Sequence, residues 1–343
     1  MLRLSWILFA LLLSANALFS ETDNRSCARP ESNDLYEFKQ NYTPIEYDYK
    51  PFRMEVIDLV VLALVMGIGT WLSLKKKPSK WITTLILLAL LYFGFFRGGC
   101  ICPVGSTTNF FMGLAHPELV GRVVAVLFLL PLIFAFFFGR VFCASACPLG
   151  AIQHLLARKK PMMIPERLNM VLRLMPIPIL FATVWGALRG GFFLACRLDV
   201  YKLLFFTGYA WIDQTLLWLK NALVEPRIIW AGDLISWGIL LLTLLLGFFV
   251  HRPFCRFVCP YGVLLGMAAK LGLRHRVIKT SSCVSCVQCV KVCPVQAISS
   301  NPKTREVTIS DFHCIQCGRC DESCKCESIC NGFGAPTPPE EKS

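Results

Sequence analysis

Long apolar stretches alternate with short polar and basic segments over most of the chain. Five of these stretches approach or reach the length of about 20 residues that an α-helix needs to cross a bilayer. They occupy residues 55–74, 81–97, 120–138, 169–188 and 231–250. The pattern predicts an α-helical integral membrane protein, with about five transmembrane helices in a membrane domain over residues 55–276.

The N-terminal residues follow a different pattern. Residues 1–20 contain one early arginine, an apolar core that is short for a span, and the small residues Ala15 and Ala17. This order is typical of a secretory signal peptide, and an uncleaved signal anchor is the alternative. In both cases the polar residues 21–54 are expected to begin outside as a short periplasmic segment.

Composition and charge give the orientation. Of the 343 residues 17% are charged, compared with about 25% in an ordinary soluble protein. The net charge of +13 comes largely from residues 75–80, 158–167 and the segment after residue 250. Because cytoplasmic loops are enriched in Lys and Arg, these segments and the C-terminus are expected inside. We therefore expect a multi-pass protein of the bacterial inner (cytoplasmic) membrane that does not bind nucleic acid.

Ten of the 18 cysteines lie between residues 283 and 330. Eight of them form two runs with the spacing Cys-x2-Cys-x2-Cys-x3-Cys, which is typical of bacterial ferredoxins with two clusters. In such proteins the fourth cysteine of each run binds the other cluster. The sequence predicts two [4Fe-4S] clusters in a cytoplasmic α+β domain over residues 277–334, followed by a tail over 335–343. The expected ligands are Cys283, Cys286, Cys289 and Cys324 for cluster 1, and Cys314, Cys317, Cys320 and Cys293 for cluster 2.

Two details of this cysteine-rich region remain open at the level of sequence. Lys325 occupies the position after the fourth cysteine of the second run, where proline is common, and Cys326 follows it as a competing ligand for Cys324. Cys330 has no assigned role. We also expect a strand over residues 305–310 and a short helix that begins at 295–298.

A second cysteine pattern is repeated in the membrane domain. Cys143 and Cys147 are four residues apart, and a proline follows the second of them. The same pattern returns 112 residues later with Cys255 and Cys259. Two cysteines four residues apart are expected to share a helix face. The two pairs could supply four thiolates to one metal or redox site, or each pair could cycle between dithiol and disulfide. Alternatively, the cysteines are small buried residues in a turn shaped by proline and glycine.

A shorter copy of this pattern contains Cys100 and Cys102, which are expected on the outer face together with Cys196. On an oxidising face, three cysteines fit either a disulfide with one free thiol or a further electron-transfer site. Histidine is scarce, with five residues outside the centres of the predicted spans. A membrane cytochrome needs paired histidines within its helices, so haem is not expected.

Taken together, these residues resemble the membrane-bound polyferredoxins of respiratory electron transfer, the NosR and NapH type. The resemblance covers about residues 81–325 and rests on FGRVFCASACPLGAI, RPFCRFVCPYGVLLG and the two ferredoxin runs. It implies that electrons pass between a quinol pool or cytoplasmic donor and a periplasmic reductase or flavoprotein. NosR-like proteins typically begin with a periplasmic flavin-binding domain, for which residues 21–54 are too few, so flavin is left undetermined.

The leading hypothesis is an electron carrier or oxidoreductase subunit rather than a stand-alone enzyme. The alternative is an assembly or maturation factor, which would use the same clusters to reduce a metal or a disulfide in a respiratory enzyme.

Overall fold

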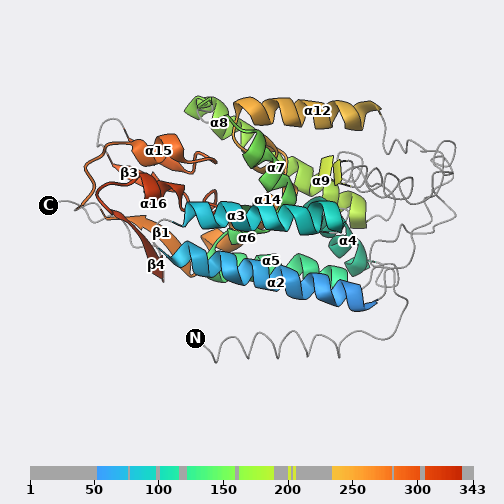
Figure 1. The fold of residues 1–343 in the computed structure, drawn as a ribbon. Coiled ribbons are helices and arrows are strands. Elements are labelled where there is room, and N and C mark those ends of the chain that lie inside the picture. Colours follow the sequence, from blue (N-terminus) through green and yellow to red (C-terminus); the bar gives the residue numbers. More distant parts are fainter. Residues whose placement is uncertain are drawn as a thin grey trace, which may run out of the picture.

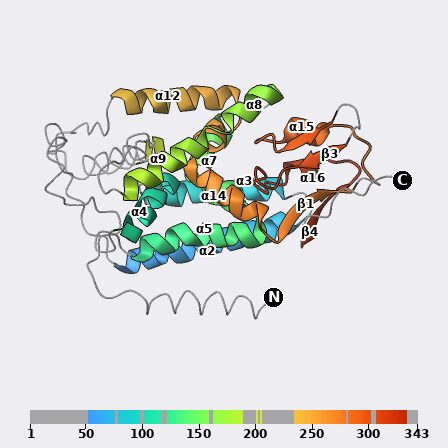
Figure 2. The same cartoon turned by 180° about the vertical axis from the view of Figure 1, so that it is seen from behind.

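The computed structural model describes residues 52–75, 78–97, 101–115, 122–158, 162–188, 200–201, 204–205, 234–279, 282–301 and 306–333. Long helices run side by side, and the strands lie together at one end of them (Figures 1 and 2). The predicted signal peptide, nearly all of the predicted periplasmic segment, the tail over 335–343, Cys100 and Cys196 lie outside the described residues.

Each of the five predicted apolar stretches forms helix in its described part. The helices are α2 (Phe52–Leu74), α3 (Ser79–Ala89) continued by the π-helix η3 (Leu90–Phe96), α5 (Arg122–Phe138), α8 (Glu166–Leu172) followed by α9 (Pro176–Leu188), and α12 (Leu234–Phe249).

Among the described residues, three segments are long and apolar enough to cross a membrane: Glu55–Leu74, Ser79–Phe96 and Glu166–Leu188. Helices α5 and α12 are apolar but have 17 and 16 residues. At 1.5 Å per residue the described part of each covers about 25 Å of the hydrocarbon thickness of about 30 Å. Length and composition therefore bear out three of the five predicted spans in the part of the chain that is described.

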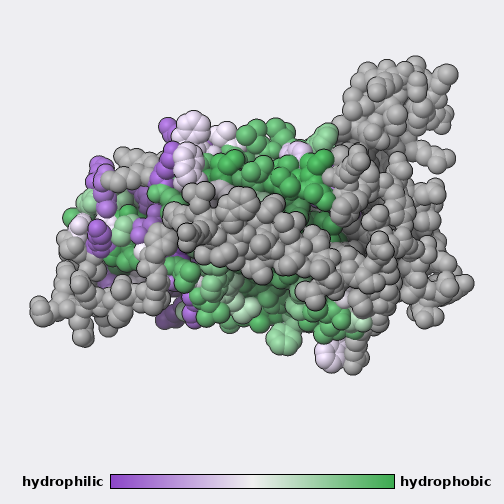
Figure 3. Space-filling model, turned by 90° about the horizontal axis from the view of Figure 1, so that it is seen from below, coloured by the Kyte–Doolittle hydropathy of each residue, from purple (hydrophilic) through white to green (hydrophobic). Residues whose placement is uncertain are grey.

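The outer surface of this helical region is apolar. Large apolar side chains such as Leu64, Phe181 and Leu241 are exposed on α2, α9 and α12. Figure 3 shows the hydrophobic residues as a broad band over the helices, whereas hydrophilic residues gather at the end that carries the strands. Because water-soluble proteins rarely expose so large an apolar surface, the band fits contact with lipid.

Short helices fold back into the bundle after two of the long ones. Helix α5 is followed by α6 (Val141–Ser145) and α7 (Pro148–Leu156), and α12 is followed by α13 (Pro253–Phe257) and α14 (Pro260–Lys270). Helix α6 packs against α2 and α3, while α14 packs against α5, α9 and an additional helix, α4 (Pro103–Ala115). The cysteine pairs at these turns therefore lie within the bundle.

The prediction that each cysteine pair shares a helix face is wrong. Cys147 and Cys259 have extended backbones and cap the N-termini of α7 and α14, so each pair is divided by a helix break. Proline follows both residues, and its ring disfavours a helical conformation at the preceding residue. Pro148 and Pro260 can still occupy the first helical position, where no amide hydrogen is required.

The cysteine-rich region forms a small unit of strands and short helices. In its described part, β1 (Arg274–Ile278) pairs antiparallel with β4 (Ile329–Phe333), and β2 (Ile298–Ser300) with β3 (Val307–Ile309). Helices α15 (Gln288–Val292) and α16 (Arg319–Ser323) pack on each other. Strand β3 lies within the strand expected over 305–310. The helix expected at 295–298 does not form, because Gln296 has a positive φ of 50° and β2 begins at Ile298.

Candidate iron–sulfur sites

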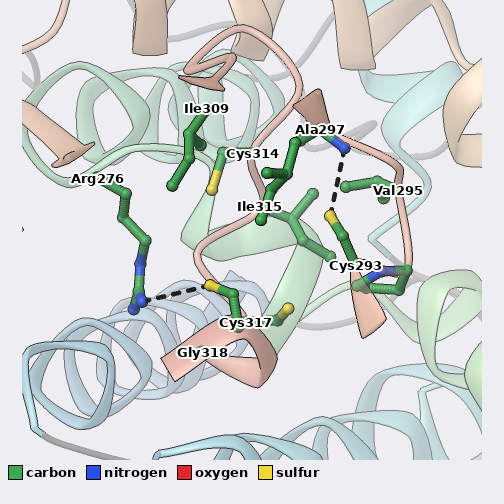
Figure 4. Close-up of a pocket in the computed structure, with 12 residues that line it drawn as sticks. Arg276, Cys293, Val295, Ala297, Ile309, Cys314, Ile315, Cys317 and Gly318 are labelled. Carbon is green, nitrogen blue, oxygen red and sulfur yellow. Dashed lines mark hydrogen bonds between the residues drawn. The ribbon is translucent and has the colours of Figure 1, made fainter. Parts of the chain in front are cut away.

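Four cysteines of the C-terminal region line one cavity (Figure 4). The cavity encloses about 340 Å³ of empty space, part of which is open to solvent. These cysteines come from both ferredoxin runs and are the set predicted for cluster 2: Cys293, Cys314, Cys317 and Cys320. Most of the remaining wall is apolar and includes Ile298, Ile309 and Ile315. A ring of thiols inside an apolar shell fits the donor set of a [4Fe-4S] cluster.

Hydrogen-bond donors surround the sulfur atoms of this cavity. The amide of Ala297 donates to Cys293 Sγ at 3.2 Å (Figure 4). Arg276 Nη1 lies 3.9 Å from Cys320 Sγ. Burial, followed by the charges of Cys317 and Cys314, raises the pKa of Cys293 to about 12. Metal binding must therefore displace this proton. At Cys314 and Cys320 the positive charge of Arg276 favours the thiolate.

The first three cysteines of the predicted cluster 1 set also lie close together. Burial raises the pKa of Cys289 in α15, and the charges of Cys283 and Cys286 raise it further. Cys283 and Cys289 pack against the same small apolar core as Cys293, which is formed around Ile298 and Val307. Cys320 of the second run is buried in this core, so the two runs share it.

Hydrogen-bond donors surround the Sγ atom of Cys324, the fourth residue of this set. Its Sγ is 3.3 Å from Ser328 Oγ. Although burial raises the pKa of Cys324, the hydroxyl and amide of Ser328 and the amides of Cys326 and Ile329 lower it below the ordinary value. Cys326 thus contributes a backbone amide to Cys324, a role that the sequence does not reveal. Cys330 Sγ contacts the carbonyl oxygen of Val277 at 3.7 Å.

The two cysteine pairs of the membrane domain come together. Burial raises the pKa of Cys147 well above its ordinary value, and the charges of Cys255, Cys143 and Cys259 raise it further. Burial likewise raises the pKa of Cys255 to about 11. The hydrogen bond from Arg252 to the carbonyl oxygen of Cys143 joins the two segments directly, although they are 112 residues apart in the sequence.

Each repeat contains an arginine that contacts the other repeat. Arg252 donates to the carbonyl oxygen of Cys143 in the other repeat. A Cβ on Gly150 would lie 3.4 Å from Arg252 Nη1, and a Cβ on Gly262 would lie 3.1 Å from Arg140 Nη2. Each guanidinium therefore lies against the glycine of the opposite repeat. The equal spacing from arginine to glycine in both repeats is the only signal of these contacts in the sequence.

Ligands for a single metal ion do not converge anywhere in the described residues: no three side chains of His, Cys, Asp or Glu are arranged for one ion. This holds for the ferredoxin runs as well as for the membrane domain. A cubane cluster is larger than one ion, so its thiolates stand apart around it.

One cysteine of the shorter copy is described. Cys102 precedes α4, and the amide of Gly105 donates to its Sγ at 3.2 Å. The amides of Gly150 and Gly262 make the corresponding contact with Cys147 and Cys259. All three copies of Cys-Pro-x-Gly therefore place a sulfur over a helix N-terminus.

Comparison with known proteins distinguishes the same two parts of the chain, the bundle with its two repeats and the cysteine-rich C-terminal region. Residues 120–165 and 234–279, which contain the two repeats, match a family described as a 4Fe-4S binding domain. Residues 275–325 match a 4Fe-4S dicluster domain. No solved structure matches the chain.

Several curated proteins are similar over most of the chain. An uncharacterized protein of Methanocaldococcus jannaschii is 26% identical over 80% of this chain and 92% of its own length. YccM of Escherichia coli, a protein named for electron transport, is 24% identical over 65% of this chain and 59% of its own length. The ferredoxin-type protein NapH of Haemophilus influenzae is 23% identical over 60% of this chain and 65% of its own length. With the two domain matches and the apolar helices, these similarities support a 4Fe-4S membrane protein that is similar to NapH and YccM.

Proposed function

We propose that this iron–sulfur electron-transport protein passes electrons between a quinol pool or a cytoplasmic donor and a periplasmic redox partner. The observation that carries the proposal is the direct packing of the cluster 2 cavity on the helical bundle. Cys293, Cys314 and Cys317 pack against the same apolar core that contains Phe142 and Leu265 of the bundle. The C-terminal region is thus part of the membrane domain's core rather than a separate domain on a linker.

Arginines of the bundle hold the C-terminal region in place. Arg140 Nη1 donates to the carbonyl oxygen of Phe312 at 2.9 Å, and Arg173 Nη2 donates to those of Val295 and Gln296 at 2.8 Å. Such charge-assisted hydrogen bonds are roughly twice as strong as neutral ones. They keep the second cysteine run close to the bundle.

A second cavity lies between the two parts. The bundle contributes Ala144 and His154, and the C-terminal region contributes Pro294, Cys317 and Arg319. Cys317 therefore borders both this cavity and the one that holds the predicted cluster 2 ligands. The arrangement supports electron exchange between the C-terminal region and the bundle.

We assign the ligands as the sequence predicts them: Cys283, Cys286, Cys289 and Cys324 for cluster 1, and Cys293, Cys314, Cys317 and Cys320 for cluster 2. A bound [4Fe-4S] cluster accepts and releases electrons at a potential that its hydrogen bonds and solvent exposure set. The chain supplies thiolates, an apolar shell that limits water, and positive groups such as Arg276 beside the sulfur atoms.

The proposed orientation has the C-terminal region on the cytoplasmic face of the inner membrane. Arg274 at the start of this region donates to Ser73 Oγ at 2.7 Å and to Ser73 O at 2.8 Å. Ser73 lies in the last turn of α2, directly before the lysine-rich segment 75–80. The ferredoxin runs and a basic loop therefore lie at the same end of the bundle, which supports a cytoplasmic location through the positive-inside rule.

Reduction of the clusters by quinol in membranes tests this function. Membranes with the full chain should develop a reduced-cluster EPR signal after addition of a quinol or a reduced ferredoxin, and the signal should decay when a periplasmic acceptor is supplied. Cys317→Ser should remove the contribution of cluster 2 to this signal, whereas the control Cys330→Ser, outside both ligand sets, should retain the full signal. Failure of every donor to reduce the intact clusters would refute the carrier function. A client enzyme that stays active after this protein is depleted would favour the assembly-factor alternative.

A further inference from the structure

We propose that the second cavity, between the bundle and the C-terminal region, binds a phosphate anion, supplied either as free phosphate or as the headgroup of an acidic phospholipid. The proposal goes beyond electron transport, because it concerns a ligand other than a cluster. The cavity encloses about 270 Å³ of empty space, part of which is open to solvent. Its polar wall comes from the start of α3, from His154 of α7, and from Arg252 and Arg319.

The start of α3 brings a helix N-terminus to the cavity. Ser79, Ile82 and Thr83, in the first turns of this helix, line the wall. The amides of a first helical turn have no acceptor within the helix, and they carry the positive end of the helix dipole. Pro78 at the N-cap makes no side-chain hydrogen bond to them, and the first turn contains no acidic residue. An anion in the cavity can therefore accept hydrogen bonds from these amides.

The C-terminal region closes the cavity at this end of α3. Figures 1 and 2 show the start of α3 beside α16. The contact is close, because a Cβ on Gly318, the N-cap of α16, would clash with the ring of Pro78. Arg319 follows Gly318, lines the cavity and donates to His154 Nε2 at 2.9 Å. Docking of the C-terminal region thus places a guanidinium beside the helix N-terminus.

Arg252 supplies a buried donor that the chain leaves unused. This residue lines the cavity and is only 3% exposed. Its Nη1 donates to the carbonyl oxygen of Cys143, whereas its Nε is buried without a hydrogen-bond partner among the described residues. A buried donor without an acceptor destabilises the fold, and phosphate oxygens are strong acceptors for guanidinium groups. This observation points to a ligand independently of the helix N-terminus.

Positive charge accumulates around the cavity. Burial, followed by the charges of Arg319, Arg252 and Arg256, lowers the pKa of His251 from 6.5 to about 4. The Nδ1 atom of His251 is also buried without a partner among the described residues. Because buried cations are normally paired with anions, this group of side chains favours an anionic ligand.

The chain offers little negative charge of its own at this place. None of the described residues that line the cavity is an aspartate or a glutamate. Glu322, whose charge acts on Arg319, is exposed and lies outside the lining. Cys317 lines the cavity and also acts on Arg319, but as a cluster ligand its thiolate would share its charge with iron. The counter-charge must therefore come largely from a bound anion.

The position of the cavity suits both sources of phosphate. Its opening to solvent admits free phosphate. Helix α3 starts the apolar segment Ser79–Phe96, and the basic residues Lys75 and Lys80 are exposed beside this start. Basic side chains at a membrane surface attract acidic lipids, which concentrates their headgroups near the cavity.

Equilibrium dialysis of the full chain against radiolabelled inorganic phosphate tests the site. The protein is purified in detergent without oxygen, its clusters are verified by EPR, and bound phospholipid is removed and counted by mass spectrometry. We expect saturable binding of one phosphate per chain after lipid removal. Arg252→Gln and Arg319→Gln should each weaken binding about tenfold or more, the loss expected for a hydrogen bond to a charged group.

Lys80→Gln is the matched control, because it removes the same charge from an exposed residue of α3 that does not line the cavity. Salt screens such exposed charges, so binding should weaken by less than about twofold. Thr83→Leu covers the case in which an arginine variant loses its clusters. It retains every charge and adds apolar bulk to the cavity wall, so it should weaken phosphate binding while the EPR signals stay unchanged.

Reconstitution distinguishes the two sources. In vesicles of phosphatidylcholine the full chain should bind inorganic phosphate. Addition of phosphatidylglycerol should displace the phosphate if a lipid headgroup is the ligand, and should leave it bound if free phosphate is; both results support the site.

Two results would overturn the proposal. One is the absence of saturable phosphate binding by the lipid-free chain with intact clusters. The other is an equal loss of binding in Lys80→Gln and in the two arginine variants, because the basic surface alone would then attract phosphate. Neither result bears on the reduction of the clusters by quinol, so the proposed electron-transport function is tested separately.

Discussion

Gly266 of α14 lies directly against Phe312 of the C-terminal region: a Cβ at position 266 would be 2.8 Å from the carbonyl oxygen of Phe312 and 3.0 Å from its ring. Phe312 also accepts the hydrogen bond from Arg140. The close approach of α14 to this residue is therefore possible only because position 266 has no side chain. The contact couples the bundle to the second ferredoxin run.

Gly266→Ala should loosen this contact. A methyl group there must displace backbone, and overpacking of this kind costs about 1–3 kcal/mol. The variant should unfold at a lower temperature in detergent, and the C-terminal region should become more sensitive to protease. Gly238→Ala in α12 is the matched control, because a Cβ at that position meets nothing within 4 Å. Equal melting temperatures for the two variants would show that the contact does not contribute to docking.

The choice between Cys324 and Cys326 can be decided by iron content. Hydrogen bonds from Ser328 and from the amides of Cys326 and Ile329 lower the pKa of Cys324, so Cys324 is the better thiolate donor. Cys324→Ala should lose about four iron atoms per chain. Cys326→Ala retains the backbone amide and should keep all of them. Loss of iron in Cys326→Ala alone would reverse the assignment.

A buried ion pair in the helical bundle makes a separate prediction. Asp58 of α2 pairs with Arg97, which follows η3, and Tyr92 donates to Asp58 at 3.1 Å. The two charged side chains are 1% and 7% exposed. Arg97→Gln would leave the Asp58 carboxylate without its main counter-charge, and breaking such a pair costs about 3–5 kcal/mol.

Thermal unfolding of three variants isolates this interaction. Arg97→Gln should be the least stable, and adding Asp58→Asn should restore part of the loss because the uncompensated charge disappears. Tyr92→Phe removes one hydrogen bond and should cost about 1 kcal/mol. A double variant less stable than Arg97→Gln would contradict the proposed origin of the effect.

Local patterns and contacts between distant segments differ in how far they could be predicted. The ferredoxin runs and the apolar stretches are local, so spacing and hydropathy were sufficient to expect them. Pro148 and Pro260 also carry the signal for the helix breaks, and this signal outweighs the i, i+4 spacing of the cysteines. Helix α4 was not expected, because residues 103–115 include polar and small residues and the helix is stabilised by packing on α5, α9 and α14.

The contacts of Arg140 and Arg252 with the opposite repeat could not be derived from the spacing of residues in the sequence. Their contacts join segments more than 100 residues apart, and which repeat an arginine contacts depends on how the short helices fold back into the bundle. The same holds for the arginines that bind Phe312 and Val295. A basic side chain in a loop can reach many hydrogen-bond acceptors, and the packing of the whole chain determines which of them it contacts.

Docking of the C-terminal region should weaken in acid through His154 of α7. Arg319 Nη2 donates to His154 Nε2 at 2.9 Å, so the imidazole must be neutral to accept. Burial, followed by the charges of Arg252, Arg319 and His251, lowers the pKa of His154 from 6.5 to about 3. Between these values the unfolded state binds the proton more readily than the folded state. The contribution of His154 to stability is therefore complete above pH 6.5 and declines as the pH falls toward 3.

Protease sensitivity of the C-terminal region, measured from pH 7.5 to pH 5, tests this contribution. The unaltered chain should become more sensitive as the pH falls, whereas His154→Gln should show a flatter response because its amide oxygen accepts from Arg319 without titrating. His275→Gln is a useful comparison: His275 Nδ1 is 2.8 Å from Asp311 Oδ2, a contact that protonation of the imidazole does not break. The explanation fails if His154→Gln and the unaltered chain show the same dependence on pH, since the acid sensitivity would then arise from other groups.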